Sequence, residues 1–381
     1  MYYNNTRYTI ENIHKITPRD IYYTVINGHL DKIKWLHENR IEVFSRGIMD
    51  VAAQYGRLEI VKFLHENRTE GCTIEAMDYA ARRGHFEIVK FLHENRSEGC
   101  TTDAMDYASQ NGHFEIVKFL HENRTEGCTN LAIDFATEYG HLEIVKWLHK
   151  NRTEGCSVYA MNHIAKLGNL HMVKWFHENR TEGCSVFAMD KAAKYGHLEV
   201  VKWLHENRTE GCTTNAMDYA VSHGHMNIVK WLHENRTEGC TIDAMESAAK
   251  AGHLDMIKWL HENRSEGCTI DTMNYAAKLG HLEVVKWLYE NRTEGCTYWA
   301  MDRAIFNDHM EIVEFLLDKY PSYVIKLPQS SYAKIVPLIQ KRFVITFRKI
   351  ENENIVREFL RKKLIYHPAS SYMKRLVENF D

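Results

Sequence analysis

The chain has 381 residues, of which 44% are hydrophobic and 26% are charged, and its formal net charge is −3. This length exceeds one ordinary compact domain and predicts either several domains or a repeat array. A nearly neutral chain gives no reason to expect binding to nucleic acid or a membrane through bulk charge. The sequence opens without a signal-peptide-like apolar run, and no stretch reaches the roughly 20 apolar residues that span a bilayer. We therefore expect a cytoplasmic or otherwise intracellular protein that is not secreted.

The positions of proline divide the chain into three parts. All five prolines lie outside residues 19–320, and proline inside a short helix would break it. We expect residues 1–18 to form an N-terminal cap and residues 19–320 to form eleven helical repeats. Residues 321–381 lose the repeat pattern, and apolar residues at helical spacing within ENIVREFLRKKLI predict a C-terminal helical cap.

Three columns of residues recur along residues 19–320 with a single period of 28 residues. Cysteine stands at positions 72, 100, 128, 156, 184, 212, 240, 268 and 296. Glycine stands at positions 28, 56, 84, 112, 140, 168, 196, 224, 252 and 280, and Asp308 takes the next place. An aromatic residue, Trp or Phe, keeps the same period from Trp35 to Phe315. Self-similarity at a fixed period indicates a stacked repeat array, in which we expect the aromatic column to form a core or inter-repeat ladder.

One repeat, CTIEAMDYAARRGHFEIVKFLHENRTEG, predicts two helices and a return loop. Thr73 can cap the first helix by accepting a hydrogen bond from a free backbone N–H. Met77, Ala80 and Ala81 recur at helical spacing and predict its inward face. Gly84 suits the left-handed residue that ends a helix. GHFEIVKFLHEN predicts the second helix, and NRTEG returns the chain to the next repeat. A helix pair of this size cannot bury its apolar face alone, so the repeats must stack.

The pattern AAxxGHxEIVKxL, which starts at Ala80, resembles the ankyrin consensus. The resemblance covers residues 19–320 and implies an all-α, ankyrin-type helical repeat solenoid that binds proteins inside cells without catalysis of its own. It names no particular partner.

The sequence departs from the ankyrin pattern in two ways. The TPLH tetrapeptide is replaced by residues 75–78, EAMD, and the repeat has 28 residues instead of about 33. The missing residues come from the return loop, where ankyrins carry a β-hairpin, so we expect shortened inter-repeat loops without it. The short repeat is similar to those of ankyrin repeat proteins from giant, amoeba-infecting DNA viruses. If the chain is viral, its partner is expected to be a protein of the host cell.

The recurring cysteines and histidines suggest metal or redox chemistry, which their spacing disfavours. No two cysteines are close enough in sequence for a CxxC zinc motif, and equivalent positions about 10 Å apart cannot form disulfides. We expect the cysteines to be small core residues. His85 and His65 represent two histidine columns, but Arg57 and Asn169 interrupt the first and Tyr289 the second. We expect hydrogen bonds at the turns, and no catalytic, cofactor-binding or metal-binding residue.

A binding site in a repeat array is expected where the repeats differ on an exposed face. The third residue after each cysteine is polar in most repeats, but three consecutive repeats carry Leu131, Tyr159 and Phe187. Four residues later, on the same helix face, stand Phe135, His163 and Lys191. We predict that these six residues bind a partner. The alternative is that the first three fold back onto the shortened loop of the preceding repeat.

These features favour a non-catalytic, monomeric scaffold for protein–protein interaction, with no small-molecule substrate. An alternative is a substrate adaptor that recruits a ubiquitin ligase, since LPQSSYAKIVPLI, from Leu327, has the Leu-Pro opening of an F-box-like segment. Pro337 interrupts the helix that such a segment needs. A third hypothesis is nucleic-acid binding, because residues 321–381 carry 12 Lys/Arg against 5 Asp/Glu. Arg361, Lys362 and Lys363 lie beside apolar positions, however, which favours a solvated helix face.

Overall fold

The computed structural model describes residues 17–39, 44–320, 323, 331 and 334. Across these residues there are twenty-two helices and no strand, which confirms the predicted all-α repeat solenoid with shortened loops. Most of the two predicted caps, residues 1–16 and nearly all of residues 321–381, lies outside the described residues. The chain forms two compact units, Met1–Ala188 and Met189–Asp381, and each is described by itself.

The helices follow one another in pairs, one pair to each repeat. The helices of the first unit are α1 (Pro18–Ile26), α2 (Leu30–Glu38), α3 (Arg46–Gln54), α4 (Leu58–Asn67), α5 (Glu75–Arg83), α6 (Phe86–Asn95), α7 (Asp103–Gln110), α8 (Phe114–Asn123), α9 (Leu131–Glu138), α10 (Leu142–Asn151), α11 (Val158–Lys166) and α12 (Leu170–Asn179). The boundary between the units falls within α13 (Phe187–Lys194). The remaining helices are α14 (Leu198–Asn207), α15 (Asn215–Ser222), α16 (Met226–Asn235), α17 (Asp243–Ala251), α18 (Leu254–Asn263), α19 (Ile270–Lys278), α20 (Leu282–Asn291), α21 (Tyr298–Phe306) and α22 (Met310–Lys319).

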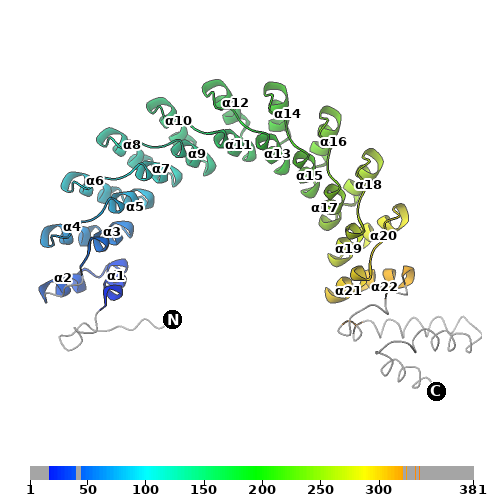
Figure 1. Cartoon of the computed structure of the whole chain (residues 1–381), viewed down its shortest axis with the longest axis horizontal. Helices are drawn as coiled ribbons and strands as arrows, with labels where there is room; N and C mark the ends of the chain where they lie inside the picture. Colours follow the sequence, from blue (N-terminus) through cyan, green and yellow to red (C-terminus); the bar gives the residue numbers. More distant parts are fainter. Residues whose placement is uncertain (1–16, 40–43, 321–322, 324–330, 332–333, 335–381) are drawn as a thin grey trace, which may run out of the picture. The chain divides into compact units, whose positions relative to one another are not determined.

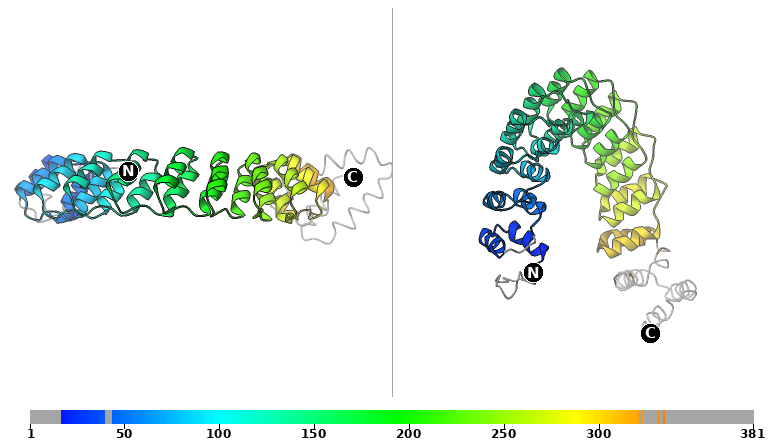
Figure 2. Two further views of the ribbon diagram at one scale, coloured as in Figure 1. Left: turned by 90° about the horizontal axis from the view of Figure 1, so that it is seen from above. Right: turned by 60° about the vertical axis from the view of Figure 1, so that its left-hand side comes forward.

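Within each unit the helices form two rows, one of odd-numbered and one of even-numbered helices (Figure 1). In the first unit α5 packs against α7, α7 against α9, and α9 against α11. In the second unit α15, α17, α19 and α21 pack in the same order. The separate rows can also be followed in the two further views of Figure 2.

The core lies between the rows and contains the residues that the repeat pattern placed inward. Met77, Ala80 and Ala81 are buried, and the alanines let neighbouring odd-numbered helices approach closely. Gly84 ends α5 in the left-handed conformation with φ 80°, as predicted. Asp308, at the eleventh glycine position, has φ 62° and is the one non-glycine residue with positive φ in the described ranges. Aspartate tolerates this conformation better than most side chains.

A row of buried or half-buried carboxyl and amide groups joins most of the odd-numbered helices to the start of the next repeat. Asp134 Oδ1 accepts a hydrogen bond from Ser157 N at 2.9 Å, and Asp134 Oδ2 accepts one from Ser157 Oγ at 2.6 Å. Ser157 Oγ in turn accepts from Tyr159 N at 3.1 Å, which is the predicted helix cap. We call this row the aspartate ladder. Its acceptors are Asp50, Asp78, Asp106, Asp134 and Asn162 in the first unit, and Asp190, Asp218, Asn274 and Asp302 in the second.

Glu246 interrupts the aspartate ladder in the second unit. Its carboxylate pairs with Lys250 Nζ at 2.6 Å, and the N–H of Thr269 has no acceptor within the described part of the chain. We expect Glu246→Asp to restore this acceptor and to raise the free energy of unfolding by about 1 kcal/mol. Urea unfolding followed by circular dichroism measures the change. Glu246→Gln is the control and should give no gain, while an aspartate variant no more stable than wild type would contradict the prediction.

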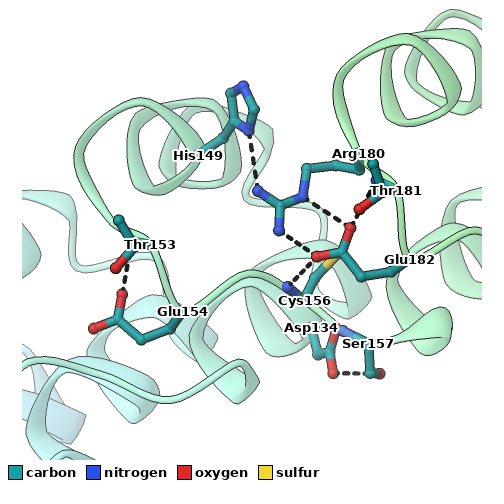
Figure 3. A network of polar contacts seen from close by, with 9 residues as sticks. All are labelled: Asp134, His149, Thr153, Glu154, Cys156, Ser157, Arg180, Thr181 and Glu182. Atoms are coloured by element: carbon teal, nitrogen blue, oxygen red, sulfur yellow. Dashed lines mark hydrogen bonds and ion pairs between the residues drawn. The ribbon is translucent and has the colours of Figure 1, made fainter.

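The return loops are joined to one another by a second set of polar contacts, which Figure 3 shows for two neighbouring loops. Arg180 forms an ion pair with Glu182, and Glu182 Oε1 accepts a hydrogen bond from Cys156 N in the preceding loop at 3.0 Å. Arg180 Nη1 lies 3.3 Å from His149 Nδ1 of the preceding repeat. We call this set of contacts the loop clamp. Its Arg–Glu pair recurs from Arg68–Glu70 to Arg292–Glu294. Side chains thus connect the loops where ankyrins carry hairpins.

The loop clamp should make the fold sensitive to acid. Burial alone would raise the pKa of Glu182, but hydrogen bonds from Arg180 and from Cys156 N outweigh it and lower the pKa to about 2. A carboxyl whose pKa falls on folding stabilises the fold fully above its unfolded pKa of 4.5 and loses that effect as the pH falls towards 2. We expect Glu182→Gln to cost roughly 2 kcal/mol at pH 7, because the side chain is 23% exposed and partly screened.

The same variant should lose less stability than wild type between pH 4.5 and pH 2, because it has no carboxylate to protonate. Urea unfolding at a series of pH values tests this. Glu178→Gln, at an exposed position of α12, is the control and should behave as wild type. Equal acid sensitivity in Glu182→Gln and wild type would contradict the role of the clamp.

The cysteine column is buried, as predicted. All nine cysteines are free and buried, and burial raises the pKa of the Cys156 thiol to about 12. Such a thiol stays protonated at neutral pH and is a poor nucleophile or metal ligand. The sequence interpretation missed the second role of this position, because the backbone N–H of Cys156 holds the loop clamp.

The two histidine columns connect repeats, and this refines the expectation of hydrogen bonds at the turns. His85 Nε2 lies 3.1 Å from the carbonyl oxygen of Gln54 in the preceding repeat. Arg57, which replaces histidine in that column, donates to the carbonyl oxygen of Ile26 in the same way. In the second column, the His65 ring packs edge-on against Phe91 of the next repeat, with ring centres 5.5 Å apart. The half-buried aromatic column is therefore an inter-repeat ladder.

Candidate binding surface

The three apolar residues of the predicted stripe lie at the N-terminal ends of α9, α11 and α13. Leu131, Tyr159 and Phe187 have exposed fractions of 42%, 60% and 51%. All three belong to the first unit. The structure therefore places these three side chains on the surface, and their contact with a partner stays a prediction.

The aspartate ladder fixes where these side chains stand. Ser157, held by Asp134, caps α11 and so positions Tyr159 at the start of that helix. In the next repeat Ser185 N donates to Asn162 Oδ1 at 3.0 Å, and Phe187 N donates to Ser185 Oγ at 3.3 Å. The exposed residues are thus attached to hydrogen bonds of the buried Asp134 and Asn162 side chains. A rigid presentation of this kind reduces the entropy lost when a partner binds.

The three residues one turn further along contact neighbouring groups. The Phe135 ring stacks on that of Tyr107, with ring centres 6.0 Å apart. His163 Nδ1 lies 3.0 Å from the carbonyl oxygen of Tyr159, and its Nε2 lies 3.5 Å from Glu138 Oε1. Phe135 and His163 are half-buried. Both residues therefore support the surface more than they project from it.

Lys191 belongs to the second unit, where its Nζ lies 5.9 Å from the ring centre of Tyr219. The structure therefore groups five of the six predicted residues in the first unit.

Two further exposed apolar residues lie on the same helices and were missed by the sequence interpretation. Tyr139 and Leu167 follow the last turns of α9 and α11 and have exposed fractions of 57% and 48%. Their column, eleven residues after each cysteine, changes from repeat to repeat and holds Arg83 and Asn111 in the two preceding repeats. We define the apolar patch as Leu131, Tyr139, Tyr159, Leu167 and Phe187. Exposed apolar groups gathered on neighbouring helices indicate an interaction site.

Trp299, an exposed aromatic residue of the second unit, is partly covered by a neighbouring side chain. The guanidinium of Arg303 lies over the ring of Trp299, 5.3 Å from its centre, and so covers one face of it. Phe306 is exposed at the end of α21.

No group of three or more metal-ligating side chains lies together in the described ranges. None of the described helices combines the length and apolarity needed to cross a bilayer.

Comparison with known families agrees with the architecture. A family model described as ankyrin repeats (3 copies) matches residues 49–134, 77–162 and 245–326. A second model, ankyrin repeats (many copies), matches residues 189–233. A search of curated proteins gave no match. Ankyrin repeats generally mediate protein–protein interaction and are typically not catalytic. Because the first model covers more than half of the 381 residues, the chain belongs to the ankyrin-repeat family.

Proposed function

We propose that this protein is a non-catalytic scaffold that binds a protein partner through the apolar patch on α9, α11 and the start of α13. The observation that carries the proposal is the exposure of Leu131, Tyr159 and Phe187 at a position that is acidic in the two preceding repeats. Tyrosine and phenylalanine are enriched in protein interfaces, where they bury large area with little loss of conformational entropy. Partial burial suits Phe135 and His163 to a supporting role, and contact of Lys191 with the partner stays a prediction.

The proposal is tested by replacing the two largest side chains of the patch. We expect Tyr159→Ala with Phe187→Ala to weaken partner binding by about 30-fold or more, because each is an exposed aromatic anchor. The melting temperature should stay within about 2 °C of wild type, since neither side chain belongs to the core. Binding is measured by affinity capture from extracts of the native host cell, followed by titration of the captured protein.

A matched control removes apolar side chains of similar exposure elsewhere. Ile242 and Ile270, beside the first turns of α17 and α19, have exposed fractions of 41% and 44%. Ile242→Ala with Ile270→Ala should leave partner binding unchanged. Equal loss in both double variants would show non-specific adhesion, and a large fall in melting temperature would show that Tyr159 and Phe187 stabilise the fold.

The C-terminal segment is proposed to cap the repeat array. Its three described residues all contact the end of the second unit. Tyr323 Oη donates to the carbonyl oxygen of Cys296 at 2.7 Å, Ser331 Oγ donates to Asp302 Oδ1 at 2.7 Å, and Lys334 pairs with Asp308. Ser331 therefore continues the aspartate ladder beyond the last repeat. These contacts favour the cap over the ubiquitin-ligase adaptor, whose remaining residues lie outside the described ranges.

The cellular setting is likewise a proposal. The similarity of the short repeat to those of giant-virus ankyrin proteins favours a host-cell partner and an intracellular location. A monomeric state remains a prediction. Capture of a ligase component by the full chain, but not by a chain ending at residue 320, would support the adaptor function instead.

A further inference from the structure

The odd-numbered row of the first unit changes its chemistry along its length. The third residue after the cysteine is Glu75 on α5 and Asp103 on α7, and it is Leu131, Tyr159 and then Phe187 on the helices that follow. One turn further along stand Tyr79, Tyr107, Phe135 and His163, all half-buried. The face thus begins with carboxylates beside aromatic rings and continues as the apolar patch. A partner that covers the whole face must match both parts.

A groove between α5 and α7 makes the acidic part concave. It has a volume of about 230 Å³, and its lining includes Glu75, Tyr79, Asp103 and Tyr107. Glu75 and Asp103 are exposed, and neither forms an ion pair with any group in the described part of the chain. The groove can therefore offer two carboxylates and the ring of Tyr79 to an incoming side chain.

The remaining charged groups of the groove are consistent with the binding of a cationic side chain. Asp78 is occupied, because its two oxygens accept hydrogen bonds from Thr101 N and Thr101 Oγ1 at 2.8 and 2.9 Å. The guanidinium of Arg82 lies over the Tyr107 ring, 4.6 Å from its centre. This contact shows that the groove accepts a planar cation on an aromatic face, an arrangement stabilised by the ring quadrupole. One arginine does not balance three carboxylates, so the groove favours a further cation.

The acidic residues are not explained by helix capping alone. A carboxylate in the first turn stabilises a helix through the macrodipole. Leu131, Tyr159 and Phe187 hold the equivalent position on α9, α11 and α13, and these helices form as well. The helix therefore forms whether or not this position is acidic. The carboxylates of Glu75 and Asp103 are thus available to contact a partner.

We propose that the partner presents an extended segment in which basic side chains precede or follow a group of apolar ones. This inference rests on the proposed function and specifies the partner's chemistry. The basic side chains enter the groove between α5 and α7, and the apolar ones cover Leu131, Tyr159 and Phe187. Neighbouring helices lie about 8–10 Å apart, and every third residue of an extended chain advances about 10 Å. A segment of about 12 residues therefore reaches from α5 across α7, α9 and α11 to Phe187 at the start of α13.

The probe is a random library of displayed peptides of about 12 residues, selected on the full-length protein. We expect enrichment of peptides with Arg or Lys at one end and aromatic or aliphatic residues at the other, spaced by about three residues. Glu75→Lys with Asp103→Lys should weaken their binding by about tenfold or more, and peptides with Glu in place of the basic residues should then recover it. The matched control is Asp243→Lys with Asp271→Lys, at the starts of α17 and α19. This double variant should change neither the binding of the selected peptides nor that of the peptides with Glu in place of the basic residues.

The outcomes separate this inference from the proposed function. In one outcome, the selected peptides lose binding to the Tyr159→Ala, Phe187→Ala variant but bind the Glu75→Lys, Asp103→Lys variant as they bind wild type. That result would support the apolar patch as a binding site and would contradict the inference that the partner carries basic side chains. Peptides unaffected by either double variant would overturn both proposals. A helical spacing of the selected residues, or no selected peptide at all, would also overturn the inference.

Discussion

Phe176→Ala is expected to lower the free energy of unfolding by about 3–5 kcal/mol, the range for truncating a fully buried phenylalanine. Phe176 lies in α12 with 1% of its surface exposed, and its ring packs edge-on against Trp175 with ring centres 5.3 Å apart. Alanine would leave a cavity in the core near the C-terminal end of the first unit. Because repeats are stabilised by their neighbours, part of the array should then unfold at lower urea concentration than the rest.

The chain itself supplies the control for this substitution. Leucine holds the equivalent position in the two preceding even-numbered helices, as Leu120 and Leu148. Phe176→Leu should therefore cost less than about 1.5 kcal/mol, because it restores a side chain that fits this slot elsewhere. Urea unfolding by circular dichroism distinguishes the variants. If leucine proved as damaging as alanine, Phe176 would have a role beyond filling space.

Asp134→Ala is expected to cost about 2 kcal/mol by removing one step of the aspartate ladder. It would leave the N–H and hydroxyl of Ser157 without an acceptor at the junction of α9 and α11. The loss is moderated because burial raises the pKa of Asp134, so that its ionised form is itself disfavoured. Hydrogen exchange at the amide of Ser157 should become faster, and urea unfolding should begin earlier.

Asparagine is the conservative variant at this position. Asn162 holds the same place one repeat later, where its Oδ1 accepts from Ser185 N and its Nδ2 donates to Ser185 Oγ. The Asp134→Asn variant should therefore retain most of the free energy of unfolding, and hydrogen exchange at the amide of Ser157 should stay slow. Fast exchange in the asparagine variant would show that the charge, and not the hydrogen bond, holds the repeats together.

The helices and their inward faces could be predicted because the same spacing of apolar residues and glycine recurs in each repeat. Helical spacing alone was enough to assign Met77, Ala80 and Ala81 to the core. The position of Gly84 after the last turn was enough to predict that it ends the helix. Such local rules depend on residues within four positions of one another. They apply without knowledge of how the repeats meet.

The contacts between repeats could not be read in the same way. Arg180 meets His149 and Glu182 meets Cys156 across separations of 31 and 26 residues. A single repeat shows Arg180 and Glu182 two residues apart in a polar loop, which looks solvated. Only the stacking distance decides that both side chains reach the preceding repeat.

The candidate site was predicted in part. The change at Leu131, Tyr159 and Phe187 was visible in the sequence, but its exposure depended on the direction in which the first turn leaves the cap at Ser157. Tyr139 was overlooked because the column that contains it follows the helix and varies in every repeat. The groove between α5 and α7 required the structure, since it is formed by two helices 28 residues apart.

In the loop clamp, each of two neighbouring repeats supplies one part of the same set of contacts. The N–H groups of Cys72, Cys100 and Cys156 each donate to the glutamate of the loop that follows, and the Arg–Glu pair recurs from loop to loop. Genetic duplication or deletion of 28 residues would therefore bring together loops that carry the same contact residues. The array can change its length in evolution without redesigning its joints, while the odd-numbered helices remain free to alter what they recognise.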